Sequence, residues 1–207
     1  MINMKANKSI HIILALLLLS SCGKEKTLGI GEYIAHVESE EAGLLKKKQV
    51  DGWIYKIQYK PAEYILLHER LDEKSYEQRK KDLTGTIWFN IAIQHADGQA
   101  GPLRYKAASH AEYEQRYNYF LTRAKDNLYV QYGTAKLYPI NYLFETSYNI
   151  APKATMVVGF ALPENETGVT RDIQLVYQDR LFHHGIIKTI FNKKDILSLP
   201  QLKQAYE

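Results

Sequence analysis

Two stretches of the chain alternate strictly between apolar and polar side chains. In residues 53–60 and 86–95, every second side chain is aromatic or branched and aliphatic. A period of two places these side chains on one face of a β-strand. Asp51-Gly52 separates the first stretch from a strand-like segment at 46–50, and Asp-Gly is a preferred two-residue hairpin turn. The pattern therefore predicts a hairpin over 46–60 and a central strand at 86–95.

The second half of the chain is predicted to be mainly β. An apolar run at 154–162 has the length of a strand buried on both faces. Pro139 confines part of its own strand to a sheet edge or a bulge, because proline donates no ladder hydrogen bond. The strands expected here are 128–132, 135–144, 154–162, 170–177 and 186–191, and a first strand is expected at 30–36.

Helices are predicted between these strands. Pro61 suits the first position of a helix, and Ser75 with Gln78 has capping-box spacing for a second helix that ends near Leu83. Ser109 with Glu112 repeats that spacing before an amphipathic segment that extends to residue 124. The elements add up to seven to nine strands and two or three packed amphipathic helices. The predicted fold class is α+β, with a mainly antiparallel sheet or a β-sandwich.

The N-terminus has the pattern of an export signal. Lys5 and Lys8 precede an apolar run at 10–19, which is too short for the roughly 20 residues that span a bilayer. The following residues, Leu19-Ser20-Ser21-Cys22, resemble the lipobox of bacterial lipoproteins. The resemblance implies cleavage before Cys22 and acylation of that cysteine, which would anchor the protein to a membrane. The alternatives are a plain secretory signal and a buried apolar helix.

This interpretation divides the chain into a removed signal peptide (1–21), a lipidated cysteine with a tether (22–31) and a single α+β domain (32–207), whose C-terminal part (about 128–200) is mostly β. Cys22 and the polar residues after it are similar to the start of many Bacteroidota lipoproteins, which implies the cell envelope and the outer membrane. The periplasmic or surface-exposed face, and an inner-membrane alternative, stay open. The run 154–195 also resembles the closing strands of immunoglobulin-like domains in bacterial lipoproteins.

Composition excludes nucleic-acid binding as a function. The chain has 27 basic and 23 acidic residues. Removal of the signal would take Lys5 and Lys8 with it, so the mature balance is 25 against 23, about +2. No basic stripe is left to neutralise phosphates. Cys22 is the only cysteine, so its lipidation would leave no thiol for catalysis or for a disulfide.

The search for reactive groups finds little. His183 and His184 are adjacent and are a weak candidate for metal binding, but neighbouring strand residues point to opposite faces and no second ligand motif is near. Carboxylates are common on the predicted helices, where a solvated face explains them; these are Glu63, Glu69, Asp72, Glu112 and Glu114. No nucleophile elbow or phosphate-binding glycine loop occurs. We therefore predict no catalytic residue and no cofactor.

Aromatic residues are the remaining candidates for a ligand surface. Trp88 and Tyr119 fall outside the predicted buried stripes, so they are the possible platform for a carbohydrate or a peptide. The leading hypothesis is a non-enzymatic envelope lipoprotein that binds or scaffolds a protein or glycan partner. The alternatives are an envelope hydrolase that acts on glycan or peptidoglycan through a carboxylate pair, and an immunity or inhibitor lipoprotein.

Overall fold

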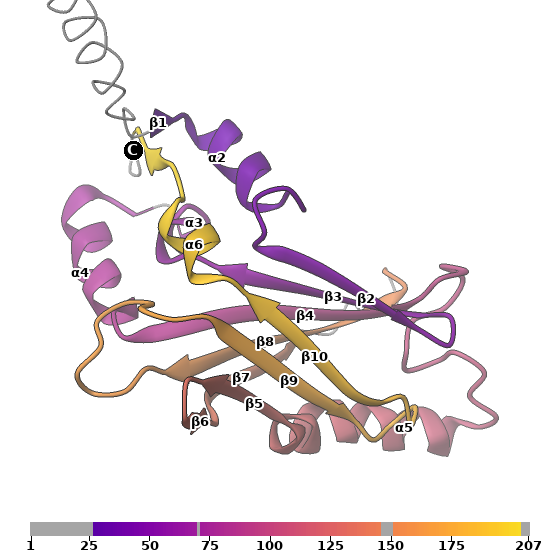
Figure 1. Ribbon diagram of the computed structural model, residues 1–207. Coiled ribbons are helices and arrows are strands. Elements are labelled where there is room, and N and C mark those ends of the chain that lie inside the picture. The colour runs from indigo at the N-terminus through magenta and orange to yellow at the C-terminus, as the bar shows by residue number, and fades with distance from the viewer. Residues whose placement is uncertain (1–26, 70, 146–150, 204–207) are drawn as a thin grey trace, which may run out of the picture.

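Two antiparallel sheets packed face to face form the body of the protein (Figure 1). The structure is a computed structural model, and it describes residues 27–69, 71–145 and 151–203. Within these residues there are eleven strands and five α-helices. The predicted α+β fold with packed sheets is therefore confirmed, although helices are more numerous than the two or three expected.

The first sheet has five strands in the order β2-β3-β4-β8-β7. Their bounds are β2 (Leu45–Val50), β3 (Trp53–Lys60), β4 (Thr86–His95), β7 (Pro139–Glu145) and β8 (Lys153–Ala161). The predicted hairpin is confirmed: Asp51 and Gly52 have φ of 47° and 81°, as a type I′ turn requires. β4 lies at the centre of the sheet, as its alternation predicts, and β8 is its antiparallel neighbour.

The second sheet has four strands in the order β10-β9-β5-β6. Their bounds are β5 (Leu128–Tyr132), β6 (Ala135–Leu137), β9 (Ile173–Asp179) and β10 (Gly185–Phe191). The predicted single strand 135–144 is wrong, because the chain leaves this sheet after Leu137 and enters the five-stranded sheet at Pro139. Pro139 lies on an edge strand beside a bulge, where its missing N–H costs no hydrogen bond.

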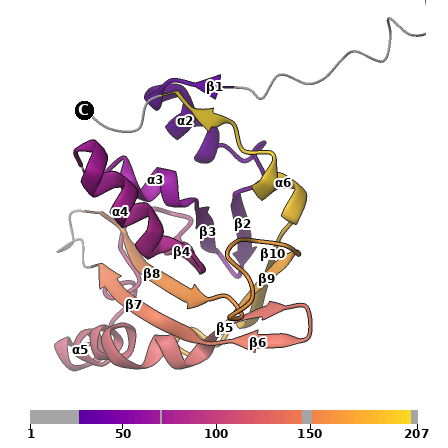
Figure 2. The ribbon, with the colours of Figure 1, turned by 90° about the vertical axis from the view of Figure 1, so that its left-hand side faces the viewer.

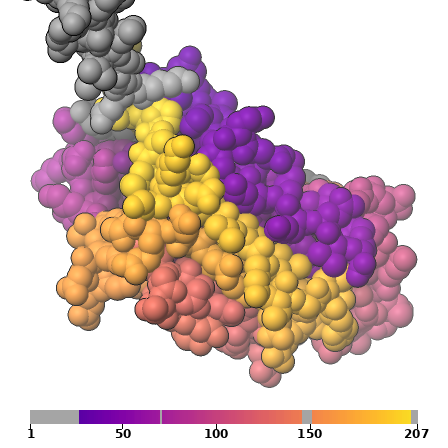
Figure 3. Space-filling model, in the orientation of Figure 1, coloured from indigo at the N-terminus to yellow at the C-terminus, as the bar shows by residue number. Residues whose placement is uncertain are grey.

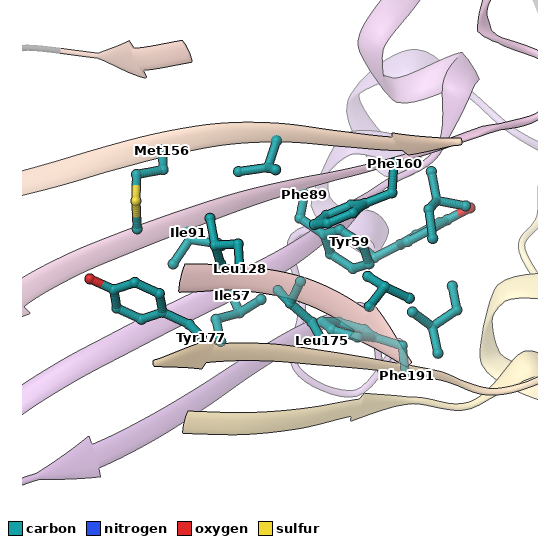
Figure 4. Packing of buried hydrophobic residues seen from close by; sticks show 14 of the residues in the cluster. Ile57, Tyr59, Phe89, Ile91, Leu128, Met156, Phe160, Leu175, Tyr177 and Phe191 are labelled. Atoms are coloured by element: carbon teal, nitrogen blue, oxygen red, sulfur yellow. The ribbon is translucent and has the colours of Figure 1, made fainter. Parts of the chain in front are cut away.

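The inner faces of both sheets meet in one hydrophobic core (Figure 4). Tyr55 and Ile57 of β3 are almost fully buried, and so are Phe89 and Ile91 of β4. They pack against side chains of the other sheet such as Leu175. The strict alternation in the sequence therefore reflects one face in this core, since only every second residue of a strand can reach it.

Four helices stand at one end of the sandwich, around the ends of its strands (Figure 2). They are α2 (Ile30–Val37), α3 (Ala62–Leu66), α4 (Glu73–Leu83) and α6 (Lys193–Leu197). The fifth, α5 (His110–Asn118), lies beside the sheets at the other side and continues into a π-turn and a 3₁₀ turn that end at Asn127. Its predicted cap is confirmed, because the Ser109 side chain accepts a hydrogen bond from the Glu112 N–H.

The predicted strand at 30–36 is wrong, because these residues form helix α2. The Glu32 carboxylate accepts a hydrogen bond from the Gly29 N–H at 3.2 Å, which caps the first turn. Tyr33 and Val37 are one helical turn apart and both are buried. A segment this short is compatible with a strand or with a helix, because its apolar residues also follow four-residue spacing. Packing of Tyr33 and Val37 in the core decides in favour of the helix.

The C-terminal segment returns to the N-terminal one. β11 (Gln201–Leu202) pairs in parallel with β1 (Thr27–Leu28), so both lie at the helical end of the sandwich. Residues 27–31, expected to belong to the tether, thus take part in β1 and α2. Figure 3 shows the yellow C-terminal segment lying against the indigo N-terminal residues on the surface.

Gly43 has φ of +72° and lies so close to Asp195 that a Cβ would come within 2.3 Å of its carboxylate.

Candidate functional site

A groove of about 1100 Å³ opens between the helices at the end of the sandwich. Its walls come from α2, the end of β3, α3, α4, the segment 162–169 and the C-terminal segment 196–203. Ligand pockets for small molecules usually measure about 300–1000 Å³, so this groove has room for a ligand of that size or larger. We refer to it below as the groove.

Tyrosines from three different elements line the groove. Tyr33 of α2 is 1% exposed, Tyr59 of β3 is 8% exposed and Tyr76 of α4 is 3% exposed. Tyr59 is the last inward-facing residue of β3, where the core stripe ends and the groove begins. Tyr76, Lys80 and Leu83 follow helical spacing on α4, which places all three on the side that faces the groove.

Two of these phenols have no hydrogen-bond partner within the described part of the chain. Tyr33 and Tyr59 line the groove, and no described residue bonds to either hydroxyl, although both side chains are buried. Burial first, and then the charge of Glu63, raise the pKa of each phenol well above its ordinary value. Both hydroxyls are therefore neutral at physiological pH, and each can donate and accept one hydrogen bond.

An ion pair crosses one wall of the groove. The Lys80 ammonium lies 3.0 Å from the Glu63 carboxylate, and both side chains are about one third to one half exposed. Burial alone would lower the pKa of Lys80, but its hydrogen bond and charge interaction with Glu63 outweigh that effect and leave the pKa raised. Lys80 is therefore charged, and its charge is compensated within the groove.

Hydrogen bonds hold the opposite wall, the loop after β8, in place. The Glu166 carboxylate accepts a hydrogen bond from the Tyr132 hydroxyl at 2.6 Å and one from the Thr170 hydroxyl at 2.6 Å. The Tyr132 oxygen in turn accepts a bond from the Thr170 N–H at 2.8 Å. The backbone of Leu162 also donates to Gly85 O at 2.7 Å, which fixes the start of the loop. This wall is therefore set before any ligand binds.

The two aromatic residues predicted as a ligand surface lie apart from the groove and in different clusters. Trp88 is on the outer face of β4, where it packs against the small cluster of Leu66, Tyr76 and Leu83 beneath α3 and α4. Its indole N–H is buried and has no partner among the residues that the structure describes. Tyr119 lies after α5, and its hydroxyl is 3.4 Å from the Tyr177 hydroxyl and accepts a bond from Asn127 at 3.2 Å. The structure does not bring Trp88 and Tyr119 together.

His184, predicted as half of a weak metal candidate, belongs to a buried polar cluster at the far end of the sandwich. Its Nδ1 lies 2.9 Å from Asp179 Oδ2 and 2.6 Å from the Tyr55 hydroxyl, which also donates to Asp179. The other carboxylate oxygen of Asp179 accepts bonds from the N–H groups of Leu181 and Phe182, both at 3.0 Å. Asp179 is fully buried, so this cluster satisfies a charge inside the protein.

His183 is separated from this cluster. It is exposed in the β9–β10 turn with φ of +60°. Among the residues that the structure describes, no three His, Cys, Asp or Glu side chains are arranged to hold a metal ion. The predicted lipidation site, Cys22, lies outside the described residues.

Sequence reasoning did not find the groove, because its residues come from segments that are far apart in the chain. The sequence pattern predicts Tyr59 in the buried stripe of its strand and Glu63 on a solvated helix face. Only the helical spacing of Tyr76, Lys80 and Leu83 signals a shared face in the sequence. The structure shows that residues from the other segments lie opposite this face of α4 and form the groove with it.

Comparisons with models of protein families, with curated proteins and with solved structures found no match for this chain. In the described part of the chain, none of the helices has the length and apolar character needed to cross a membrane. The fold and the groove therefore define a class only: an α+β sandwich with a ligand-sized groove at its helical end.

The groove phenols should make the protein sensitive to alkali. In the unfolded chain tyrosine loses its proton near pH 10, whereas Tyr33 and Tyr59 keep theirs in the folded protein. The unfolded state then binds fewer protons, so the free energy of unfolding falls as pH rises above about 10, by up to about 1.4 kcal/mol per pH unit for each phenol. Urea unfolding between pH 8 and 11 measures this slope.

Tyr33→Phe and Tyr59→Phe should each make the slope of the unfolding free energy against pH shallower, whereas Tyr138→Phe, at a 59% exposed position, should not. An equal slope in all variants would contradict the assignment.

The two adjacent histidines should differ sharply in their effect on stability. His184→Ala leaves the buried Asp179 carboxylate without its imidazole partner, and breaking a buried pair costs roughly 3–5 kcal/mol. His183→Ala removes an exposed side chain and should change stability by less than about 0.5 kcal/mol. Urea unfolding at neutral pH compares the two variants. Similar losses for both would show that His184 does not stabilise Asp179.

Proposed function

We propose that this protein is a lipid-anchored binding protein of the bacterial cell envelope, and that it holds its partner in the groove without catalysing a reaction. The observation that carries the proposal is a pair of tyrosines in the groove wall, Tyr33 and Tyr59, whose side chains are almost fully buried and whose hydroxyls have no partner among the described residues. Neither hydroxyl is among the fully enclosed unpaired atoms of the described chain, so both are open to hydrogen bonds with water or a ligand in the groove. A groove with convergent polar groups on a rigid wall is typical of a binding site.

The position of the groove agrees with an anchor at Cys22. Four residues lie between Cys22 and Thr27, the first residue of β1, and a fully extended chain spans at most about 3.6 Å per residue. β1 pairs with β11, and Gln201 and Leu202 of β11 line the groove. An acylated Cys22 would therefore keep the groove within a few tens of ångströms of the bilayer, facing partners at the membrane surface.

A glycan hydrolase is the second candidate. Glu63 and Glu77 both line the groove, and a glycosidase needs two carboxylates across a cleft. Glu63, however, already binds Lys80 at 3.0 Å, so its use as an acid or base would require that ion pair to open. Binding without catalysis needs no such rearrangement and is the better-supported function.

A bulky side chain in the groove should abolish binding. Gly168 lines the groove, and a Cβ there would meet no atom within 4 Å, so Gly168→Trp adds a large ring without a clash at the backbone. Gly31→Trp on the exposed face of α2 is the matched control, because its Cβ position is equally open. A ligand at 100 times its Kd stabilises the native protein by about 2.7 kcal/mol. Thermal unfolding of the full-length protein in detergent, with envelope glycans and peptides, should show this gain in the wild type and the control only.

Two results would contradict binding without catalysis. If every stabilising compound acts equally on Gly168→Trp, the groove is not the binding site. If the wild type releases reducing sugar from cell-wall material and Glu77→Gln does not, hydrolysis replaces binding as the function.

The anchor is tested by substituting the cysteine. Cys22→Ala removes the proposed acceptor of the acyl chains and the residue before which the signal peptidase would cut. Metabolic labelling with a clickable fatty acid should mark the wild type and not the variant, and the variant should accumulate as the uncut precursor in a gel-shift assay. Labelling that survives in Cys22→Ala would refute the lipid anchor.

A further inference from the structure

We infer that the groove selects an uncharged, hydroxyl-rich ligand, a neutral oligosaccharide, and that the hydroxyls of Tyr33 and Tyr59 bind it directly. This inference rests on the proposed function of the groove, and it narrows the ligand from any envelope partner to one chemical class. It depends on three properties of the groove: its unpaired hydroxyls, its compensated charge and its mixed lining.

The unpaired hydroxyls stand out among the buried tyrosines of the described chain. Other buried tyrosines have defined acceptors: Tyr55 donates to Asp179, Tyr64 to Glu38 and Tyr132 to Glu166. Tyr33 and Tyr59 are as buried as these and have none within the described residues. Phenylalanine would fill the same space without an unpaired group, so the hydroxyls point to a partner that enters the groove.

The form of these hydroxyls suits a sugar. Each is a neutral phenol that can donate one hydrogen bond and accept another, and a sugar hydroxyl has the same double capacity. A carboxylate or phosphate accepts only, so it would use the donor of each phenol and leave its oxygen unmatched. Two such groups from different elements, α2 and β3, can therefore read two positions on a polyhydroxylated chain.

The charges in the groove do not favour an ionic ligand. No arginine is among its lining residues, although arginine is the residue best suited to bidentate binding of carboxylate and phosphate. Lys80 is compensated by Glu63 at 3.0 Å. Lys60 has its ammonium 5.5 Å from the Tyr64 ring centre, and burial lowers its pKa. The remaining charges in the lining are the exposed Lys203 and Glu77, so three lysines stand against two glutamates. An anion would thus meet one paired lysine, one desolvated lysine and a single exposed lysine, with no bidentate site.

The lining also disfavours a purely apolar ligand such as an acyl chain. An acyl chain would cover the Tyr33 and Tyr59 hydroxyls without bonding to them, and a polar group left unpaired under a ligand weakens binding. Apolar side chains such as Leu83, Ile87 and Leu162 are present as well, and they offer contact to the C–H faces of sugar rings. A ligand with hydroxyl edges and apolar faces matches both parts of the lining.

Calorimetric titration of the full-length protein in detergent tests the inference. The probes are neutral oligosaccharides of glucose, mannose and N-acetylglucosamine, uronic-acid oligomers of matched length, and short peptides. We expect neutral oligosaccharides to bind and the uronic-acid oligomers to bind at least tenfold more weakly. Tyr33→Phe and Tyr59→Phe each remove one hydroxyl, so each should weaken binding about three- to tenfold. Tyr138→Phe, at an exposed position outside the groove, should bind as the wild type does.

Thermal unfolding of the same variants separates a binding role from a structural one. Because the two hydroxyls have no protein partner, Tyr33→Phe and Tyr59→Phe should unfold at or above the wild-type temperature, whereas a structural hydroxyl would lower it. Loss of stability with unchanged sugar affinity overturns the assignment of the hydroxyls.

The outcomes also separate this inference from the proposed function. Uronic-acid oligomers or peptides that bind in preference to neutral sugars, and that lose affinity in Gly168→Trp, overturn the neutral-sugar class and leave a binding groove. Binding that Gly168→Trp does not affect overturns both.

Discussion

The shared hydrophobic core between two sheets is the constraint on which the rest of this structure depends. A sandwich buries the inner faces of its strands, but the two ends of the core, where the strands stop, must be closed by other means. At one end, where β3 begins and β9 stops, aromatic rings close the core: Trp53 stacks on Phe182 with ring centroids 3.9 Å apart, next to the buried Asp179 cluster. At the other end the closure is helical, and it is incomplete.

The incomplete closure produces the groove. The four helices at that end are short, the longest being the eleven residues of α4. Each packs a few side chains against the rim of the sandwich, such as Tyr33 and Val37 of α2 and Ile196 of α6. None extends across the centre, so the last residues of the core stripe, above all Tyr59, border open space. The same residue is therefore a core residue by its ring and a site residue by its hydroxyl.

The contrast between the long core strands and the short helices at the end of the sandwich determines how much of the structure the sequence can predict. Strands in the core repeat every second residue over eight to ten positions, as in β3 and β4, and that signal is strong enough to place both strands correctly. The helices of the end closure are short and their contacts are non-local. For that reason the strand predicted at 30–36 is wrong and the segment is helical. The predicted cap of α4 is wrong as well, because Asp72 caps this helix and Ser75 does not. Elements of five to eight residues carry too little periodicity to outweigh tertiary packing.

The site was harder to predict than the fold for a related reason. A groove is defined by side chains that converge from separate segments, and here α2, β3, α3 and α4 contribute between one and three polar groups each. The sequence shows Trp88 and Tyr119 as aromatic residues outside the buried stripes, and the structure uses the first as packing beneath α4 and the second in a hydrogen-bonded chain with Tyr177. Whether a tyrosine hydroxyl has a hydrogen-bond partner cannot be predicted from the sequence, because the partner comes from a distant segment of the chain.

The contrast between the two polar clusters bears on function. Asp179, Tyr55 and His184 satisfy one another, and two backbone N–H groups complete the shell, so that cluster has little capacity left for a ligand and serves stability. The side chains of Tyr33 and Tyr59 are also buried, but their hydroxyls have no partner among the described residues. Buried tyrosines of this protein thus occur both with and without a hydrogen-bond partner. The difference lies in whether the hydroxyl faces the core or the groove. Other buried phenols of this fold have partners, whereas these two have none among the described residues and border the groove, which is why we propose the groove, rather than the histidine cluster, as the site of binding.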